Sequence, residues 1–470
     1  MRRTKIVATV GPTTSDIDSM TDLIGAGVDV IRLNASHGTL EQHRDNARQA
    51  RHIATNMGRT VGVLIDLPGP KLRSGDITNS EVELSLGQTF TLYGTEVPGN
   101  VAGVSTTLPA LGSWLSPGHE VFLADGAIVL EVLDSDGVDV VTTVRRAGVL
   151  RSRKGMHVPH AEQHIDPFTD RDAAALEMAI EIRADFVGLS FVRSADDIEG
   201  VRARLPKRGM RPALIAKIET ALAIDNLSAI IAIADAVMVA RGDLGIQIPA
   251  RQVPLIQKDI IRLCNIAGRP VITATQMLES MTRSPLPTRA EVNDVANAVI
   301  DGTDALMLSE ETAIGSHPSD VVRTMAEVAE AAEAWDRHVV TPNGATSADN
   351  DKVAWAVAAA AVHAAKDLGV SAILCPTRSG QTARRVAAFR PPMPIAGISP
   401  TNEVLAGLSL VWGVTPLSVP ETTDPGQQLR LAVQSARTSN LVAEGELVAL
   451  VFGDSGPRAG STDSVRIVRA

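Results

Sequence analysis

Short apolar runs alternate with longer helix-like stretches over much of the chain. Three runs lie at residues 5–12, 28–34 and 61–66, and five more follow residue 167, in DFVGLSFVR, ALIAKIE, AVMVARGD, PVITATQM and ALMLSEET. Short apolar runs bounded by turn residues predict buried strands, and the stretches between them have the length of helices. Eight successive β-then-α units predict a closed (β/α)8 TIM barrel, with an open doubly wound sheet as the alternative.

A different pattern interrupts the barrel after its third strand. From about residue 77 to residue 158, alternating segments such as VELSL, TFTLYG and AIVLEVL are separated by Gly, Asp and Pro. A period of two predicts half-buried strands, so we expect a small inserted all-β domain, called the β domain below.

A second α/β segment follows a polar stretch (TPNGATSADND) that reads as a linker near residues 340–350. An Ala-rich helix at 353–367, the strand SAILCP and a helix opened by TRSGQT predict a separate C-terminal α/β domain. The expected division is 1–75 for the first part of the barrel, 76–158 for the β domain, 159–340 for the second part of the barrel with the active site, and 350–470 for the C-terminal regulatory domain.

Composition excludes several classes of protein. The chain of 470 residues has 44 Lys and Arg against 54 Asp and Glu, a net charge of −10, which argues against a general nucleic-acid-binding surface. Its two cysteines, Cys264 and Cys375, are too few and too far apart for a disulfide framework or a thiolate metal site. No apolar run reaches membrane-spanning length. We therefore expect a cytoplasmic protein that binds neither nucleic acid nor membrane.

Two charged strand ends carry the clearest candidate chemistry. ALIAKIE ends with Lys217 and Glu219, and AVMVARGD ends with Arg241 and Asp243. Consecutive parallel strands place the two carboxylates side by side, at the end of the barrel where such folds hold their sites. Two carboxylates beside a lysine and an arginine could hold Mg²⁺ or Mn²⁺ together with an anionic substrate. Two ion pairs that cap the strands are the alternative.

Cations gather at the same predicted end of the barrel. They are Arg32, Lys71, Arg73, Lys217 and Arg241. In an acidic chain, such a cluster favours an anionic ligand, and phosphate is the natural choice. RGDLG adds backbone N–H groups at a helix start that could accept an anion, although Asp-Leu-Gly also makes an ordinary helix cap.

The chain resembles the pyruvate kinase family in several long motifs: KIVATVGP, RLNASHG, IAKIE, MVARGDLGIQIP, VITATQMLESM, PTRAEVNDVANAVIDGTDALMLSEETAIGSHP and the Trp-Gly-Val at Trp412. The resemblance covers the barrel, the β domain and the C-terminal domain. It implies a glycolytic phosphotransferase that moves the phosphoryl group of phosphoenolpyruvate to ADP, giving pyruvate and ATP. It also implies a homotetramer and a sugar-phosphate or nucleotide effector.

The resemblance implies a role for individual residues as well. Glu219 and Asp243 match the carboxylates that bind the divalent metal, and Lys217 matches the lysine that neutralises the transferring phosphoryl group. Three further groups are implied: Arg32, Lys217, Gly242, Asp243 and Thr275 for phosphoenolpyruvate; Asn34, His37, Arg73 and Lys154 for the nucleotide; and Thr275 with Ser309 for protonation of the enolate through a water relay. A solvated surface residue is the alternative for His37 and Lys154.

One departure from the family pattern predicts a changed ion requirement. The third strand ends in Asp66-Leu67-Pro68-Gly69-Pro70-Lys71, where the family usually has Asp-Thr-Lys-Gly-Pro-Glu. In the common form, Asn34, Ser36, Asp66 and the carbonyl of Leu67 would bind K⁺. An ammonium in place of the glutamate could take the electrostatic role of this ion, so we expect activity without added K⁺. A simple ion pair between Lys71 and Asp66 is the alternative.

Two more departures bear on activity. Glu310 replaces a glycine beside Ser309, and a carboxylate near an anionic substrate is unfavourable unless it points away. This keeps two other functions open, an enzyme of the same barrel type acting on a different enolate or phospho-substrate, and a non-catalytic metabolite sensor. Gln247 replaces the usual glutamate, and we expect it in a surface or interface pair.

The TRSGQT segment resembles the loop that holds a phosphorylated effector in this family. Its candidate residues are Thr377, Ser379, Gly380 and Thr382. Hydroxyl and backbone N–H groups at a helix start suit a phosphate, and an ordinary capped helix start is the alternative.

Overall fold

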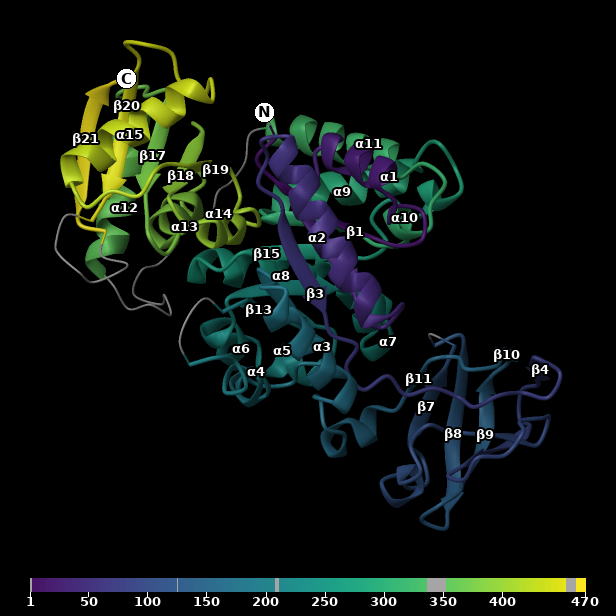
Figure 1. The fold of residues 1–470 in the computed structure, drawn as a ribbon. Coiled ribbons are helices and arrows are strands. Elements are labelled where there is room, and N and C mark those ends of the chain that lie inside the picture. Colours follow the sequence, from purple (N-terminus) through teal and green to yellow (C-terminus); the bar gives the residue numbers. More distant parts are fainter. Residues whose placement is uncertain (1, 125, 208–210, 336–351, 454–461) are drawn as a thin grey trace.

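A closed barrel of eight parallel strands lies at the centre of the molecule, as predicted (Figure 1). The structure is a computed structural model that describes residues 2–124, 126–207, 211–335, 352–453 and 462–470. Around the barrel the strand order is β1-β16-β15-β14-β13-β12-β3-β2. The strands are β1 Lys5–Thr9, β2 Val30–Asn34, β3 Gly62–Asp66, β12 Phe186–Leu189, β13 Ala213–Ile218, β14 Ala236–Ala240, β15 Val271–Ala274 and β16 Ala305–Leu308.

Helices between the strands cover the outside of the barrel. They are α1 Ile17–Gly25, α2 Leu40–Asn56, α3 Asp170–Glu181, α4 Ala195–Arg202, α5 Ala221–Asp225, α6 Leu227–Ile233, α7 Arg241–Gln247, α8 Val253–Ala267, α9 Arg289–Asp301, α10 Glu310–Ala313 and α11 Pro318–Glu333. Local sequence sets their ends: Thr39, Thr169 and Thr288 form capping boxes. The stretch between β13 and β14, expected as one helix, is split into α5 and α6 at Asn226.

The β domain is inserted between β3 and α3 and lies at the lower right of Figure 1. Its strands are β4 Glu81–Leu84, β5 Thr89–Tyr93, β6 Gly103–Ser105, β7 Glu120–Leu123, β8 Ile128–Ser135, β9 Val140–Arg146, β10 Gly148–Arg151 and β11 Met156–His157. They form a two-stranded sheet, β10-β4, and a six-stranded sheet, β11-β7-β8-β9-β5-β6. The two sheets share one apolar core that contains Phe90, Leu130 and Val144.

The C-terminal domain is a five-stranded sheet with helices, at the upper left of Figure 1. Its elements are α12 Lys352–Asp367, β17 Ala372–Pro376, α13 Gln381–Ala388, β18 Ile395–Ser399, α14 Asn402–Leu408, β19 Val414–Ser418, α15 Pro425–Thr438, β20 Leu447–Phe452 and β21 Ser464–Arg469. Sequence patterns missed β19 and the antiparallel edge strand β21, since both mix polar with apolar residues. The linker expected near 340–350 lies outside the described residues.

The C-terminal domain closes the end of the barrel where the strands begin. Leu410, in the loop after α14, is 1% exposed and packs with inward-facing barrel residues such as Val30, Phe186 and Ile215. A Cβ on Gly62, the first residue of β3, would lie 2.4 Å from Ser409 Oγ, so the two segments are in close contact. Part of the barrel interior is therefore filled by a side chain from another domain.

We expect Leu410→Ala to destabilise the protein by about 2–5 kcal/mol, because the cavity would open among packed strands that cannot collapse onto it. Urea denaturation, with the midpoint and slope compared to the parent, measures the loss. Leu368→Ala is the matched control, since Leu368 belongs to the same domain but is 52% exposed. Equal midpoints for the two variants would contradict this packing role.

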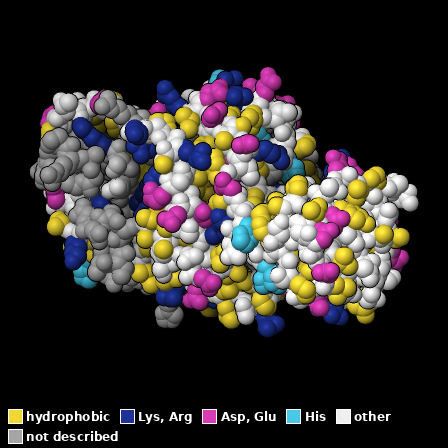
Figure 2. Space-filling view, turned by 90° about the horizontal axis from the view of Figure 1, so that it is seen from below, with side chains coloured by type: hydrophobic (Ala, Val, Ile, Leu, Met, Phe, Trp, Pro, Cys, Tyr) yellow, Lys and Arg dark blue, Asp and Glu magenta, His cyan; other side chains and the backbone are white. Residues whose placement is uncertain are grey.

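The surface facing the viewer in Figure 2 mixes charges. Where side chains are described, acidic and basic groups are interspersed over this face rather than gathered into one basic area. Within the described part of the chain, no helix is long and apolar enough to cross a membrane.

Candidate active site

A row of buried charges from β2, β3 and β13 crosses one side of the barrel, where β12 lies between β3 and β13. Arg32, at β2, donates from Nε to Asp66 Oδ2 over 2.8 Å and from Nη1 to Thr9 Oγ1 over 2.9 Å. Asp66, at the end of β3, lies 3.3 Å from Lys217 Nζ, and Glu219 lies 3.4 Å from the same ammonium. The sequence therefore anticipated the members of this row, and the parallel strand order brings them into contact.

Burial and charge act against each other on Lys217 and Asp66. Burial disfavours the ammonium of Lys217, but the carboxylates of Asp66 and Glu219 outweigh it and raise its pKa. Burial likewise disfavours the Asp66 carboxylate, and the charges of Lys217 and Arg32 together lower its pKa. Both groups are therefore charged at neutral pH, with the lysine side chain only 11% exposed.

Ser190 is a member of the site to which sequence reasoning gave no role. Its Oγ accepts from Lys217 Nζ over 2.6 Å and donates to the carbonyl of Leu67 over 2.7 Å. The available signal was its position directly after the buried strand β12, in the segment DFVGLSFVR. Ser190 thereby fixes the direction of the lysine ammonium.

Glu219 is fully buried and has an oxygen available to a cation. Its Oε1 accepts from the backbone N–H of Phe191 over 2.6 Å, whereas Oε2 has no hydrogen-bond partner. Burial is the main cause that raises the pKa of Glu219 to about 7, and the charge of Asp243 adds to it. A buried carboxylate oxygen that has an ion pair to Lys217 but no hydrogen bond, and that lies close to a second carboxylate, fits a divalent cation.

The described residues contain no cluster of three or more His, Cys, Asp or Glu side chains that could hold a metal by themselves. Glu219 and Asp243 could supply two ligands, which leaves the remaining positions of a Mg²⁺ ion to substrate and water. Asp243 lies in the first turn of α7 and lines the cleft between the barrel and the β domain.

Thr275 follows β15 in an unusual backbone conformation. It has a φ of 65°, and Gln276 follows with a φ of 55°. A β-branched residue in the left-handed region costs about 1–3 kcal/mol and needs support from its surroundings. Gly242 N–H donates to Thr275 Oγ1 over 2.9 Å, which joins two residues that the sequence assigned to one subsite.

Arg241 is not directed at a ligand position, contrary to its place among the expected substrate-facing cations. It is 8% exposed, and its guanidinium donates to Asp294 Oδ2 over 2.6 Å and to the carbonyl of Thr275 over 2.5 Å. The sequence correctly predicted Arg241 at a strand end. The direction of its side chain, however, depends on Gln257 of α8 and Asp294 of α9.

Ser309 and Glu310 follow β16 at the same end of the barrel. Glu311, not Glu310, turns inward: it is 2% exposed and accepts from the backbone N–H groups of Ser309 and Leu278 over 2.6 and 3.3 Å. Ser309 Oγ is buried without a hydrogen-bond partner. Glu310 is exposed, but its carboxylate is close enough to His37 to raise the pKa of that ring, against the burial and cations that lower it.

The group expected to surround a monovalent cation is partly engaged within the protein. Asn34 Oδ1 accepts from Ser36 N–H over 3.1 Å, and the carbonyl of Leu67 is taken by Ser190. Lys71 forms no ion pair with any described residue, so the simple pair with Asp66 is not present. Burial and the charge of Lys217 lower the pKa of Lys71. The carboxylates of Asp243, Glu219 and Asp66 act in the opposite direction but do not outweigh them.

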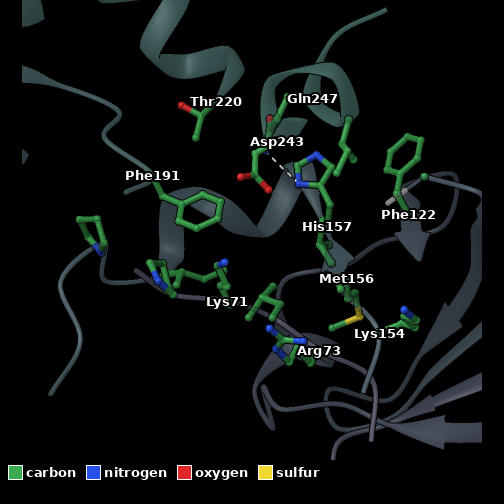
Figure 3. Close-up of a pocket in the computed structure, with 18 of the residues that line it drawn as sticks. Lys71, Arg73, Phe122, Lys154, Met156, His157, Phe191, Thr220, Asp243 and Gln247 are labelled. Atoms are coloured by element: carbon green, nitrogen blue, oxygen red, sulfur yellow. Dashed lines mark hydrogen bonds between the residues drawn. The ribbon is translucent and has the colours of Figure 1, made fainter. Parts of the chain in front are cut away.

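A cleft of about 280 Å³ lies between these strand ends and the β domain. In Figure 3, Lys71 and Asp243 project into it from the barrel side, and Arg73 and Lys154 lie toward the β domain. Arg73 also donates from Nη1 to the carbonyl of Arg153 over 3.1 Å. His37 is close enough for burial and the charges of Lys71, Arg73 and Arg32 to lower its pKa.

Gln247, which we expected in a surface or interface pair, has a partner in the β domain that the sequence did not identify. Gln247, at the end of α7, lies 3.0 Å from His157 Nδ1 of β11, as the dashed line in Figure 3 shows. Burial lowers the pKa of His157 to about 4, so its ring is neutral at pH 7. Gln247 thus lies in the cleft, where it joins the barrel to the β domain.

The candidate effector loop opens α13. Thr377 Oγ1 accepts from Gly380 N–H over 2.9 Å, and Gly380 has a φ of 79° at the N-cap position. Thr382 and Thr462 share a hydrogen bond of 2.8 Å between their hydroxyls, and Ser379 Oγ is buried without a hydrogen-bond partner. These hydroxyls lie far from the barrel strand ends in the sequence and belong to the C-terminal domain.

Comparisons with known proteins cover both ends of the chain. Residues 1–322 match the family model described as pyruvate kinase, barrel domain, and residues 355–468 match pyruvate kinase, alpha/beta domain. A pyruvate kinase of Geobacillus stearothermophilus is 41% identical over 469 residues, which cover 99% of this chain and 80% of the relative. One of Thermotoga maritima is 37% identical over 469 residues, with 100% of both chains covered.

A solved structure has the same fold over the whole length. The crystal structure of a pyruvate kinase from Cryptosporidium parvum superposes with a TM-score of 0.92 at 33% identity, covering 100% of this chain and 96% of that one. Both domain models match, and the relatives cover the full chain. The chain is therefore a phosphotransferase that belongs to the pyruvate kinase family.

Proposed function

We propose that this chain carries out the glycolytic transfer of the phosphoryl group of phosphoenolpyruvate to ADP in the cytoplasm, with Mg²⁺ or Mn²⁺ and without a requirement for K⁺. The observation that carries the proposal is the buried ammonium of Lys217, which lies 3.3 Å from Asp66 and 3.4 Å from Glu219 at the end of β13. The neighbouring strand β14 leads to Asp243, which lines the cleft. Positioning and charge stabilisation are what phosphoryl transfer needs from a protein.

The proposed roles follow from the contacts. Lys217 neutralises charge on the phosphoryl group as it moves, because its ammonium is held in place by Ser190 and needs no reorganisation. Arg32 binds the substrate phosphate with the guanidinium N–H groups that Asp66 and Thr9 leave over. We assign the nucleotide to Arg73 and Lys154, which line the cleft, and to Asn34 and His37, at the end of β2 and in the loop after it.

Glu219 and Asp243 would hold the divalent cation. It would supply positive charge that stabilises the negative charge developing during phosphoryl transfer. Glu219 suits this role because its Oε2 is buried, has no hydrogen-bond partner and lies 3.4 Å from Lys217 Nζ, so that a cation would add to the charge compensation that the lysine supplies.

Thr275 and Ser309 deliver the proton to the enolate carbon through water. The hydroxyl of Thr275 accepts from Gly242 N–H, and its own proton is directed at the carbonyl of Ala274 over 2.6 Å. Ser309 Oγ is buried with no partner, so a water molecule at this position would gain a hydrogen bond. When the substrate carboxylate binds, Gly242 N–H and the Thr275 hydroxyl would exchange their present hydrogen bonds for bonds to it.

Lys71 supports the proposed K⁺ independence. The Lys71 ammonium is close enough to interact with the charges of Asp66, Glu219 and Asp243, so it adds a positive charge beside these three carboxylates, as K⁺ would.

The proposal extends to a homotetramer and to a sugar-phosphate or nucleotide effector at Thr377, Ser379, Gly380 and Thr382. Hydroxyls at the N-terminus of α13, an eight-residue helix, support the effector site.

The proposed domain limits are those expected from the sequence, 1–75, 76–158, 159–340 and 350–470. The positions of the elements support these limits. β3 ends at Asp66, and β4 to β11 extend from Glu81 to His157. The boundary between the barrel and the C-terminal domain lies between α11 and α12. The limits at 340 and 350 fall outside the described residues.

We expect pyruvate and ATP to form from phosphoenolpyruvate and ADP in a Mg²⁺ buffer whose only monovalent cation is tetramethylammonium, and added K⁺ to change the rate less than about twofold. A lactate dehydrogenase-coupled assay for pyruvate, with ATP measured separately, provides both readouts. Pyruvate without ATP would favour a different enolate chemistry. No Mg²⁺-dependent turnover with either ion would favour a non-catalytic sensor, and strong K⁺ activation would contradict the role of Lys71.

A further inference from the structure

Two consecutive residues, Arg241 and Gly242, hold Thr275 from opposite sides. Gly242 N–H donates to the Thr275 hydroxyl over 2.9 Å, while the Arg241 guanidinium donates to the Thr275 carbonyl from Nη2 over 2.5 Å and from Nε over 3.2 Å. The side chain and the backbone of Thr275 are thus both tied to the first turn of α7, which also carries Asp243.

Arg241 binds the neighbours of Thr275 as well. Nε donates to the carbonyl of Ala274 over 3.2 Å, and Nη2 to the carbonyl of Gln276 over 3.2 Å and to Met277 Sδ over 2.7 Å. A planar guanidinium can reach several carbonyls at once, which a lysine ammonium cannot do in the same geometry. The carbonyls of Ala274, Thr275 and Gln276 therefore all accept from the Arg241 guanidinium. Two of these residues, Thr275 and Gln276, have a positive φ.

The guanidinium is itself fixed by two helices. Asp294 of α9 accepts from Nη1 over 2.6 Å, and Gln257 of α8 accepts from the same nitrogen over 3.3 Å. Asp294 is partly exposed, whereas Arg241 is 8% exposed. The outer layer of the barrel thereby sets the position of Arg241, and Arg241 sets the backbone on which Thr275 lies.

We propose that Arg241 is a positioning residue that holds Thr275 in its left-handed conformation and thereby keeps the threonine hydroxyl beside Gly242, the residue next to Asp243. The inference rests on the role assigned to Thr275 under the proposed function. Without Arg241, the unfavourable φ of 65° would relax and carry the hydroxyl away from the substrate. Arg241 itself does not touch the substrate in this arrangement.

Arg241→Lys should lower kcat by roughly 10- to 100-fold with a much smaller change in the KM for ADP, because a displacement of the order of 1 Å is enough to cost this much. Deuterium uptake into the methyl group of pyruvate, followed by NMR in D₂O with Mg²⁺ and ATP, should fall in parallel. Asp294→Asn keeps the arginine but removes its charged partner, and it should show a smaller loss in the same two rates.

The matched control is Arg390→Lys. Arg390 is equally buried, at 7% side-chain exposure, and pairs with Asp304 over 2.9 Å, but it belongs to the C-terminal domain. It should lower the melting temperature as Arg241→Lys does and leave kcat within about twofold of the parent. A similar loss of kcat in both variants would overturn the proposal, since general destabilisation would then explain it.

A double-mutant cycle separates this inference from the proposed role of Thr275. If Arg241 acts through Thr275, Arg241→Lys should have little further effect on kcat and deuterium uptake in a Thr275→Val background. An equal loss in both backgrounds, or no loss from Arg241→Lys alone, would overturn the inference. If Thr275→Val by itself leaves both rates unchanged, the role of Thr275 under the proposed function is wrong, and the inference falls with it.

Discussion

Lys217→Met should lower kcat by roughly 10³-fold or more, with the substrate still bound. The ammonium is the only cation that lies within 3.4 Å of both Asp66 and Glu219 in the described part of the chain, and Ser190 directs it. Methionine has a similar shape but no charge, so the negative charge on the transferring phosphoryl group would not be neutralised. Steady-state kinetics with varied phosphoenolpyruvate and ADP measure the loss.

Lys5→Met is the matched control for this variant. Lys5 is also a buried barrel lysine, 7% exposed, but it lies at the start of β1. Its Nζ donates to the carbonyl of Val414 over 2.8 Å and is 3.8 Å from Asp29. Both variants leave a buried carboxylate without its lysine and should lose stability, but only Lys217→Met should lose turnover. If Lys217→Met kept more than a tenth of kcat, the proposed mechanism would be wrong.

Lys71→Glu should convert the protein into a K⁺-dependent enzyme. In K⁺-free buffer we expect kcat to fall roughly 100-fold, a barrier increase of about 2.7 kcal/mol, because a carboxylate would replace an ammonium close to Asp66, Glu219 and Asp243. Added K⁺ should restore most of the rate by supplying the missing charge. A titration of kcat with KCl at constant ionic strength measures the effect.

Lys366→Glu provides the same reversal of charge on the exposed face of α12, in the C-terminal domain. It should leave both the rate and its independence of K⁺ unchanged. An active Lys71→Glu variant without K⁺ would show that Lys71 does not take the place of the ion. Loss of activity that K⁺ does not restore would assign Lys71 to substrate binding instead.

The arrangement of the barrel could be read from the sequence because its signals are local. Each strand is a short apolar run, and polar residues follow it at a turn, so both the element and its functional end are visible. Parallel order then places the ends of β13 and β14 together, which is enough to pair Glu219 with Asp243. The edge strand β21, with its mixed pattern, had no such local signal.

The direction of long side chains could not be read in this way. Arg241 and Arg32 both follow apolar strand residues, yet Arg32 turns toward Asp66 inside the site and Arg241 turns toward Asp294 and the carbonyls after β15. Both partners lie more than thirty residues away. The same applies to the contact of Gln247 with His157, which joins two domains.

The sequence by itself determined the barrel, the inserted β domain, the family and the set of charged strand ends. These features depend on periodicity, on the order of the strands and on residue identity at fixed spacing, and all three can be read directly from the sequence. Only the tertiary structure decided that Leu410 fills the barrel interior, that Ser190 directs Lys217, and that Arg241 supports Thr275. Burial and hydrogen bonding set these contacts, and both depend on which distant segments meet.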